Sequence, residues 1–146
     1  MIIPYGRANV KRSLLDKKKG PSVLSLFPEL DPNSAILSSE EIRTMINQGW
    51  LIVSSTFNAR CLQSTSYDVR VGQKGIIGGK GSVIDLNKES LIIHPGSYAG
   101  VLSFEKIKLP NRVLAQIGSK RKPSYDGLIL LTGAIIDPGY EGHLLF

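Results

Sequence analysis

Three short clusters of polar and charged residues could carry chemistry in this chain. The first lies in "QSTSYDVRVG", residues 63–72, where Asp68 and Arg70 stand two positions apart. Because side chains alternate between the two faces of a β-strand, a strand here predicts that Ser66, Asp68 and Arg70 share one face. Taken alone, this pattern favours a solvent-facing strand with a weak ion pair.

The second cluster is "GSKRKPSYDG", residues 118–127, which places Lys120, Arg121 and Lys122 in a loop bounded by Gly and interrupted by Pro. Three adjacent cationic side chains could hold phosphate groups. Taken alone, the stretch is equally typical of a solvated basic turn.

The third cluster is "GAIIDPGYEG", residues 133–142, in which an apolar run delivers Asp137 into a Pro-Gly turn followed at once by Tyr140. The conservative interpretation is a β-turn with Asp as its first residue, because Asp favours that position and Pro and Gly favour the next two.

Several familiar catalytic sites are excluded by residue counts. The chain has one cysteine, Cys61, and two histidines, His94 and His143, so the usual zinc sites are nearly ruled out. No Walker loop and no G-x-S-x-G elbow is present. Cys61 cannot form an internal disulfide, which fits a reducing cytoplasm.

Length, composition and charge define the organisation of the chain. With 146 residues and ordinary apolar content, it predicts one domain that binds no membrane and carries no secretion signal. The net charge of +6 is concentrated in the first twenty residues. We therefore expect a basic extension over residues 1–34, a mobile terminus or an arm that contacts nucleic acid or protein. Residues 35–146 form the expected β-rich domain.

One helix is expected before the β-rich part. In "LSSEEIRTMINQGW", Ser38 and Glu41 form a capping-box pattern, apolar residues recur at helical spacing, and Gly49 can take the left-handed C-terminal position. The pattern predicts a helix from about Ser39 to Gln48.

Short β-rich runs separated by Gly, Pro and Asn follow this helix. The fold class they indicate is all-β, or β-rich α+β, as a small barrel or sandwich with one helix in front. "HPGS", residues 94–97, predicts a turn, and the Gly-rich residues 72–82 predict a hairpin loop. The runs are "WLIVSS", "SYDVRVG", "GSVIDL", "SLIIH", "YAGVLSFEKI", "RVLAQIG", "GLILLTGAIID" and "GHLLF".

Taken together, the motifs resemble the dCTP deaminase branch of the dUTPase superfamily. The resemblance covers about residues 36–146 and is carried by the helix, the Q-x-x-S-x-D-V-R-x-G stretch, "HPGSYAGVLSFEKIKLPNRVLAQI" and I-D-P-G-[aromatic]-x-G, in that order. It implies a distorted dUTPase-like β-barrel that assembles as a homotrimer, with deoxynucleoside triphosphate sites between subunits. It also implies that Mg²⁺ arrives on the phosphates, and that no zinc is used.

The resemblance also implies roles for individual residues. Asp137 would bind the deoxyribose 3′-hydroxyl, with a tentative catalytic role, and Tyr140 would stand against the sugar ring. Asp68 and Arg70 would lie near a subunit interface and the phosphate end. Lys120, Arg121 and Lys122 complete the expected nucleotide-binding set. The implied reaction is hydrolytic deamination of dCTP to dUTP, or onward to dUMP.

The chain departs from the family pattern in its second motif. Family members typically show R/K-S-S-L-G-R-x-G, and an ungapped match places Arg121 and Lys122 at the serines and Tyr125 at the assisting Arg. A one-residue gap would instead bring Ser119 or Ser124 to a serine position. The alternative function is therefore an inactive relative that senses nucleotides or serves as a scaffold.

The catalytic Glu of the family would be the next residue after Phe146. We expect either that the chain is part of a longer protein or that the natural protein lacks this general acid/base. The unpaired edge of a barrel without its last strands favours the first interpretation, or completion by a partner.

Overall fold

The computed structural model describes residues 2–4, 36–78 and 81–146. Of the basic extension expected over residues 1–34, all but residues 2–4 lies outside this part of the chain. Contacts of this extension with nucleic acid or protein stay a prediction. None of the described helices has both the length and the hydropathy needed to cross a bilayer.

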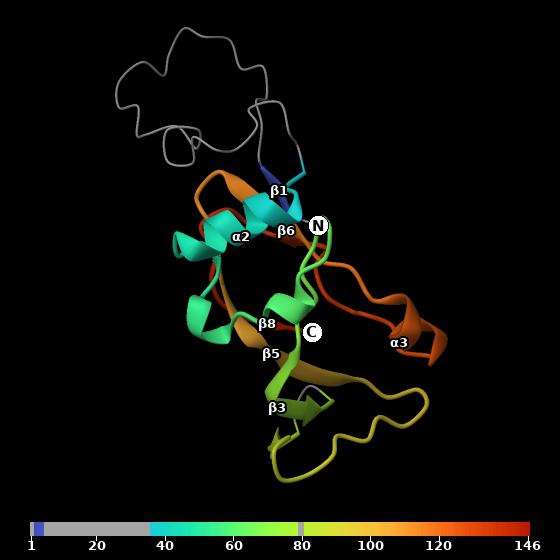
Figure 1. Cartoon of the computed structure of the whole chain (residues 1–146). Helices are drawn as coiled ribbons and strands as arrows, with labels where there is room; N and C mark the ends of the chain where they lie inside the picture. The colour runs from blue at the N-terminus through green and yellow to red at the C-terminus, as the bar shows by residue number, and fades with distance from the viewer. Residues whose placement is uncertain (1, 5–35, 79–80) are drawn as a thin grey trace, which may run out of the picture.

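The strands form two antiparallel sheets (Figure 1). The larger sheet has the order β2-β5-β3-β4, with β8 also paired to β5. The smaller sheet has the order β1-β6-β7. The strand bounds are β1 (Ile2–Pro4), β2 (Leu51–Ile52), β3 (Val71–Ile77), β4 (Val83–Asp85), β5 (Ala99–Lys108), β6 (Val113–Gln116), β7 (Ile135–Ile136) and β8 (Glu141–Leu145). These sheets confirm the β-rich, dUTPase-like fold class.

The predicted helix is present as α2 (Ser39–Asn47). Ser38 caps it in a complete capping box with Glu41. At the other end, Gly49 has φ +84°, and the backbone N–H of Trp50 donates to the carbonyl of Met45 at 2.9 Å. This is a Schellman ending, in which the left-handed residue lets the chain turn back and satisfy the last carbonyls. Local sequence signals therefore suffice to begin and end this helix.

The core is one apolar cluster that joins both sheets and α2. Within the larger sheet, β5 turns its buried side chains toward this cluster with the two-residue period of a strand. The buried members are Leu37, Ile42, Met45, Ile46, Leu51, Ile52, Ile107, Leu109, Val113, Ala115, Ile136 and Leu144.

One turn prediction is confirmed, and the other is wrong in part. At residues 94–97 the backbone N–H of Ser97 donates to the carbonyl of His94 at 3.0 Å, and Gly96 has φ +77°. Of residues 72–82, which the sequence predicts as a hairpin loop, 72–77 belong to strand β3, which pairs antiparallel with β4.

Several predicted strands are wrong, wholly or in part, including residues 50–55, of which only Leu51–Ile52 is a strand. Residues 90–94 and 128–134 form no strand, and residues 66–70 are irregular apart from one isolated bridge between Tyr67 and Leu62. A second helix, α3 (Arg121–Tyr125), also occupies the loop expected between two strands. It projects from the side of the molecule (Figure 1). Residues 128–134 are apolar enough for a strand. A strand forms only where a neighbouring strand supplies backbone hydrogen bonds, and residues 128–134 pair with none in the part of the chain that the structure describes.

Candidate functional site

A cavity of about 530 Å³ lies where the first two sequence clusters meet. One wall is residues 66–71, and the other is residues 116–120 with Pro123. Its floor is made of core side chains that include Ile107 and Leu144. Charged groups thus stand beside an apolar surface.

The wall formed by residues 66–71 is shaped by a tight local fold. Asn58 caps a short 3₁₀ turn, Ala59–Cys61, by accepting from the backbone N–H of Arg60. The backbone N–H of Asp68 then donates to the carbonyl of Cys61 at 2.8 Å. Since these bonds bend the chain, the expected alternation of faces fails, and Tyr67 and Arg70 reach the same partner.

That partner is Glu105, a fully buried carboxylate on β5. Its Oε1 accepts from Nε of Arg70 at 2.6 Å and from the hydroxyl of Tyr67 at 3.2 Å. Its Oε2 accepts from the backbone N–H of Arg70 at 2.8 Å. The arginine also donates from Nη2 to the carbonyl of Thr56 at 2.6 Å, and its guanidinium lies 4.4 Å from the ring centroid of Phe104.

The network keeps both donors protonated. Burial, with further contributions from Glu105, raises the pKa of Tyr67 to about 12. The hydrogen bond to Glu105 raises the pKa of Arg70 above its ordinary value. The phenol therefore remains a hydrogen-bond donor and the guanidinium remains a cation under ordinary conditions.

Asp68 faces the other wall of the cavity. Its Oδ2 accepts from Nζ of Lys120 at 2.6 Å and from Nε2 of Gln63 at 3.0 Å. The ion pair expected between Asp68 and Arg70 is replaced by two separate pairs: Asp68 with Lys120 across the cavity, and Arg70 with Glu105 on β5. The lysine side chain is 65% exposed, so it can leave this pair at little cost.

The remaining basic residues of the second cluster lie on α3. Lys120 is the N-cap of this helix, while Arg121 and Lys122 are exposed and do not line the cavity. The guanidinium of Arg121 lies 6.0 Å from the ring centroid of Tyr125. At the base of the helix, the hydroxyl of Ser124 donates to that of Ser119 at 3.2 Å. The phosphate contacts expected of Lys120, Arg121 and Lys122 stay predictions.

The third cluster forms the expected turn and lines a second, smaller hollow. The backbone N–H of Tyr140 donates to the carbonyl of Asp137 at 3.2 Å, and Gly139 has φ +81°, as a type II turn requires. Asp137 and Tyr140 line a hollow of about 250 Å³. Ile117, Ile136 and Leu144 line both hollows, so the two adjoin. Within one chain, Asp137 therefore does not share the hollow of Asp68 and Arg70.

Sequence reasoning missed Glu105. The signal was present, because alternation along "VLSFEKIKL" places Ser103, Glu105, Ile107 and Leu109 on the face that β5 buries. A carboxylate at an inward position of an apolar run is rarely left without partners. Its presence there indicates a built ion-pair network.

Within the described residues, no group of three or more His, Cys, Asp and Glu lies close enough to hold a metal ion. A hard cation such as Mg²⁺ prefers several oxygen ligands, and it often takes them from phosphates and water. The cations Arg70 and Lys120, which line this cavity, fit an anionic ligand.

A model of the dCTP deaminase-like family matches residues 36–146. The chain belongs to the dCTP deaminase-like family. This assignment agrees with the resemblance drawn from the sequence motifs.

Relatives from archaea support this membership. The chain is similar to a dCTP deaminase of Pyrococcus horikoshii, with 36% identity over 94 residues, or 64% of this chain and 58% of the relative. It is also similar to a dUMP-forming dCTP deaminase of Nanoarchaeum equitans, with 31% identity over 140 residues. That alignment covers 75% of this chain and 70% of the relative. A dUMP-forming dCTP deaminase of Methanosphaera stadtmanae is 26% identical over 129 residues, or 75% of this chain and 66% of the relative.

The chain therefore spans less than two thirds of the length of the Pyrococcus relative. Family membership rests on these findings, whereas the reaction, the substrate, the Mg²⁺ and the trimeric assembly are proposals.

Proposed function

We propose that this protein binds a deoxynucleoside triphosphate in the larger cavity and hydrolytically deaminates dCTP. The observation that carries the proposal is that Arg70 and Lys120, from two separate family motifs, line one cavity with an apolar floor. Water adds to the cytosine C4 and ammonia leaves, so dCTP and water give dUTP and ammonia. Hydrolysis of dUTP to dUMP and pyrophosphate is the further step.

The phosphates would bind on the side of Lys120. Its exposed ammonium can exchange Asp68 for a phosphate oxygen, and charge-assisted hydrogen bonds of this kind are among the strong ones. Arg121 and Lys122 on the neighbouring helix add positive potential at the entrance. Mg²⁺ would arrive with the triphosphate and neutralise part of its charge.

The sugar would bind beside Asp137 and Tyr140 of another subunit. In one chain these residues line the smaller hollow and not the larger cavity, and a neighbouring copy would supply them to a composite site. Large apolar side chains are exposed at both hollows, as expected of a surface that is covered in an assembly. Ile135 and Leu145 line the smaller hollow, and Leu128 and Ile129 line the larger cavity. A homotrimer in light scattering would agree with this proposal.

Deamination also needs a general acid/base. The resemblance assigns this role to a Glu directly after Phe146, and Phe146 itself lines the cavity. We also propose that the protein is located in the cytoplasm.

A second candidate function is nucleotide sensing without catalysis. The observation that favours it is α3, which carries Arg121 and Lys122 where an ungapped family match expects serines. Such a site retains phosphate affinity while it loses groups of the deamination centre.

Product analysis of the full-length protein tests the two candidates. The protein is incubated with dCTP or dUTP and Mg²⁺, and nucleotides are separated by ion-exchange chromatography. Formation of dUTP or dUMP with release of ammonia supports the deaminase. If no product forms at high protein concentration, the deaminase proposal is wrong.

Thermal unfolding with the same nucleotides then tests binding. A ligand at about 100 times its Kd stabilises the folded state by about 2.7 kcal/mol. Removal of Mg²⁺ with EDTA should reduce this shift. No shift with any deoxynucleotide would leave only a scaffold.

A further inference from the structure

Glu105 is bonded on both carboxylate oxygens by one short segment, residues 67–70. Oε1 accepts from the hydroxyl of Tyr67 and from Nε of Arg70, and Oε2 accepts from the backbone N–H of Arg70. A buried carboxylate is stable only with such a full set of partners. The residue thus ties both the side chain and the backbone of Arg70 to the sheet.

The strand that carries Glu105 is a rigid base. β5 pairs with β2, β3 and β8. The hydroxyl of Ser103 donates to the carbonyl of Glu105 at 2.7 Å and accepts from the backbone N–H of Leu144 at 2.8 Å. These bonds fix the position from which the carboxylate reaches the cavity wall.

The bonds to Arg70 leave one edge of its guanidinium available. Nε donates to Glu105 and Nη2 donates to Thr56, while Phe104 packs against the flat face. Among the residues that the structure describes, Nη1 has no hydrogen-bond partner. The side chain is 36% exposed and lines the cavity. By contrast, Lys120 is 65% exposed and is held by one surface ion pair.

We propose that Glu105 is a positioning residue for phosphate binding: it orients Arg70 so that the free edge of the guanidinium faces the cavity before the ligand arrives. This inference rests on the proposed function, because it concerns the same cavity. Arg70 is the cation that is already oriented before the ligand binds. Lys120 is the cation that leaves Asp68 to bind the ligand.

The physical reason is that the side-chain entropy of Arg70 is lost before the ligand binds. A free arginine loses rotamer freedom when it binds a phosphate, and that loss reduces affinity. In this protein the cost is met during folding, by the bonds to Glu105 and Thr56. Pre-organisation of one such side chain corresponds to roughly a three- to tenfold gain in affinity.

Charge and positioning predict effects of opposite sign at this residue. Glu105→Gln removes a negative charge beside the cavity, so a purely electrostatic role would make the variant bind an anion more tightly. A positioning role makes it bind more weakly, because the amide has one acceptor oxygen, whereas Nε and the backbone N–H of Arg70 bond to two. The direction of the change in Kd decides between them.

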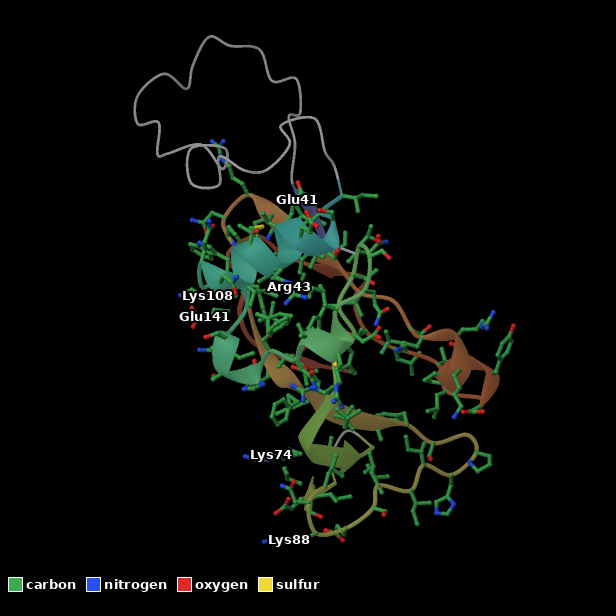
Figure 2. All side chains as sticks on the ribbon, in the orientation of Figure 1. Glu41, Arg43, Lys74, Lys88, Lys108 and Glu141 are labelled. Atoms are coloured by element: carbon green, nitrogen blue, oxygen red, sulfur yellow. The ribbon has the colours of Figure 1, made fainter. Side chains whose placement is uncertain are left out.

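The experiment measures binding of inorganic tripolyphosphate and of dCTP to the full-length protein by calorimetry. We expect Glu105→Gln to raise both Kd values about tenfold. Glu141→Gln is the control, because Glu141 also accepts from a cation at 2.7 Å, but its partner Lys106, unlike Arg70, lines neither cavity. Figure 2 shows Glu141 next to Lys108, on the side of the view opposite α3. This control should keep wild-type affinity.

A double-mutant cycle shows whether Glu105 acts through Arg70. If it does, Arg70→Gln and the double variant have the same Kd, because no guanidinium remains to be oriented. Circular dichroism sets a temperature at which all variants are folded. Independent losses that add in the double variant would show a general structural role and would overturn the proposal.

Nuclear magnetic resonance of the wild-type protein keeps the test open even if Glu105→Gln does not fold. The Nε–H of Arg70 should be protected from solvent exchange, and tripolyphosphate should leave that protection intact. Loss of protection on binding would show that phosphate removes Arg70 from Glu105, against the proposal. If the wild-type protein binds neither ligand, the proposed function and this inference both fail. Unchanged or tighter binding by Glu105→Gln overturns this inference alone.

Discussion

Lys120 and Asp68 lie 52 positions apart in the sequence, yet Nζ of the lysine is 2.6 Å from Oδ2 of the aspartate. This pair joins the two walls of the larger cavity, which come from the first and second sequence clusters. The lysine is the more exposed partner, and the carboxylate keeps a second donor, Gln63. The pair is therefore easily opened from the lysine side, which suits a group that must transfer to a phosphate.

The first prediction concerns this lysine. Lys120→Gln should raise the Kd for tripolyphosphate about tenfold, because one charge-assisted hydrogen bond to phosphate is lost. Unfolding stability should change by less than about 1 kcal/mol, as for most surface ion pairs. Lys106→Gln is the control, because it removes a similar exposed pair with Glu141. Equal affinities for both variants would show that Lys120 binds no phosphate.

The second prediction separates a ligand contact from a turn residue at Asp137. The turn is closed by backbone atoms, so Asp137→Asn should alter stability by less than about 0.5 kcal/mol. It should weaken dCTP binding in calorimetry about tenfold, since a charged acceptor is lost. Unfolding of this variant, with no effect on the affinity of the folded fraction, would make Asp137 a turn residue only.

Asp85→Asn is the same exchange at a half-buried position outside both hollows. Hydrogen bonds from Asn87, first its backbone N–H, hold the pKa of Asp85 below its ordinary value. A depressed pKa means that the ionised carboxylate adds stability above its unfolded-state pKa and loses it as pH falls through the folded-state pKa. The exchange should therefore lower stability near neutral pH. It should leave dCTP affinity unchanged, because Asp85 lines neither cavity.

The third prediction concerns alkaline pH. The pKa of Tyr67 is raised from 10.0 to about 12, mainly by burial. The contribution of the protonated phenol is thus complete below the unfolded-state pKa and is lost as pH rises through the folded-state value. Tyr67→Phe should remove a late-titrating phase from the ultraviolet absorbance of tyrosinate. Tyr125 is 81% exposed, so Tyr125→Phe should retain that phase.

The fourth prediction concerns Gly139. A Cβ there would lie 2.8 Å from Oδ1 of Asn111, at φ +81°. Gly49 has φ +84° but open space around it. In urea unfolding, Gly49→Ala should cost about 1 kcal/mol for the left-handed backbone alone. Gly139→Ala should cost more, and Asn111→Ala added to it should restore only the difference. Equal losses at the two glycines would contradict the contact.

The sequence by itself determined α2 and the turns. Ser38, Glu41 and Gly49 act on backbone groups within a few positions, so their effects do not depend on the rest of the chain. The same holds for the turn at residues 94–97 and for the backbone of the turn at Asp137. The order of the motifs also sufficed to indicate the dCTP deaminase-like family.

Only the tertiary structure decided how the side chains of the site are paired. Alternation assigned Tyr67 and Arg70 to opposite faces, but a buried carboxylate 35 positions beyond Arg70 draws both toward β5. Likewise, residues 128–134 have the composition of a strand and form none. The reason is the same in both cases. Ladder bonds and buried ion pairs join residues that are distant in sequence, and a buried charge imposes its need for partners on whichever segment the fold brings beside it.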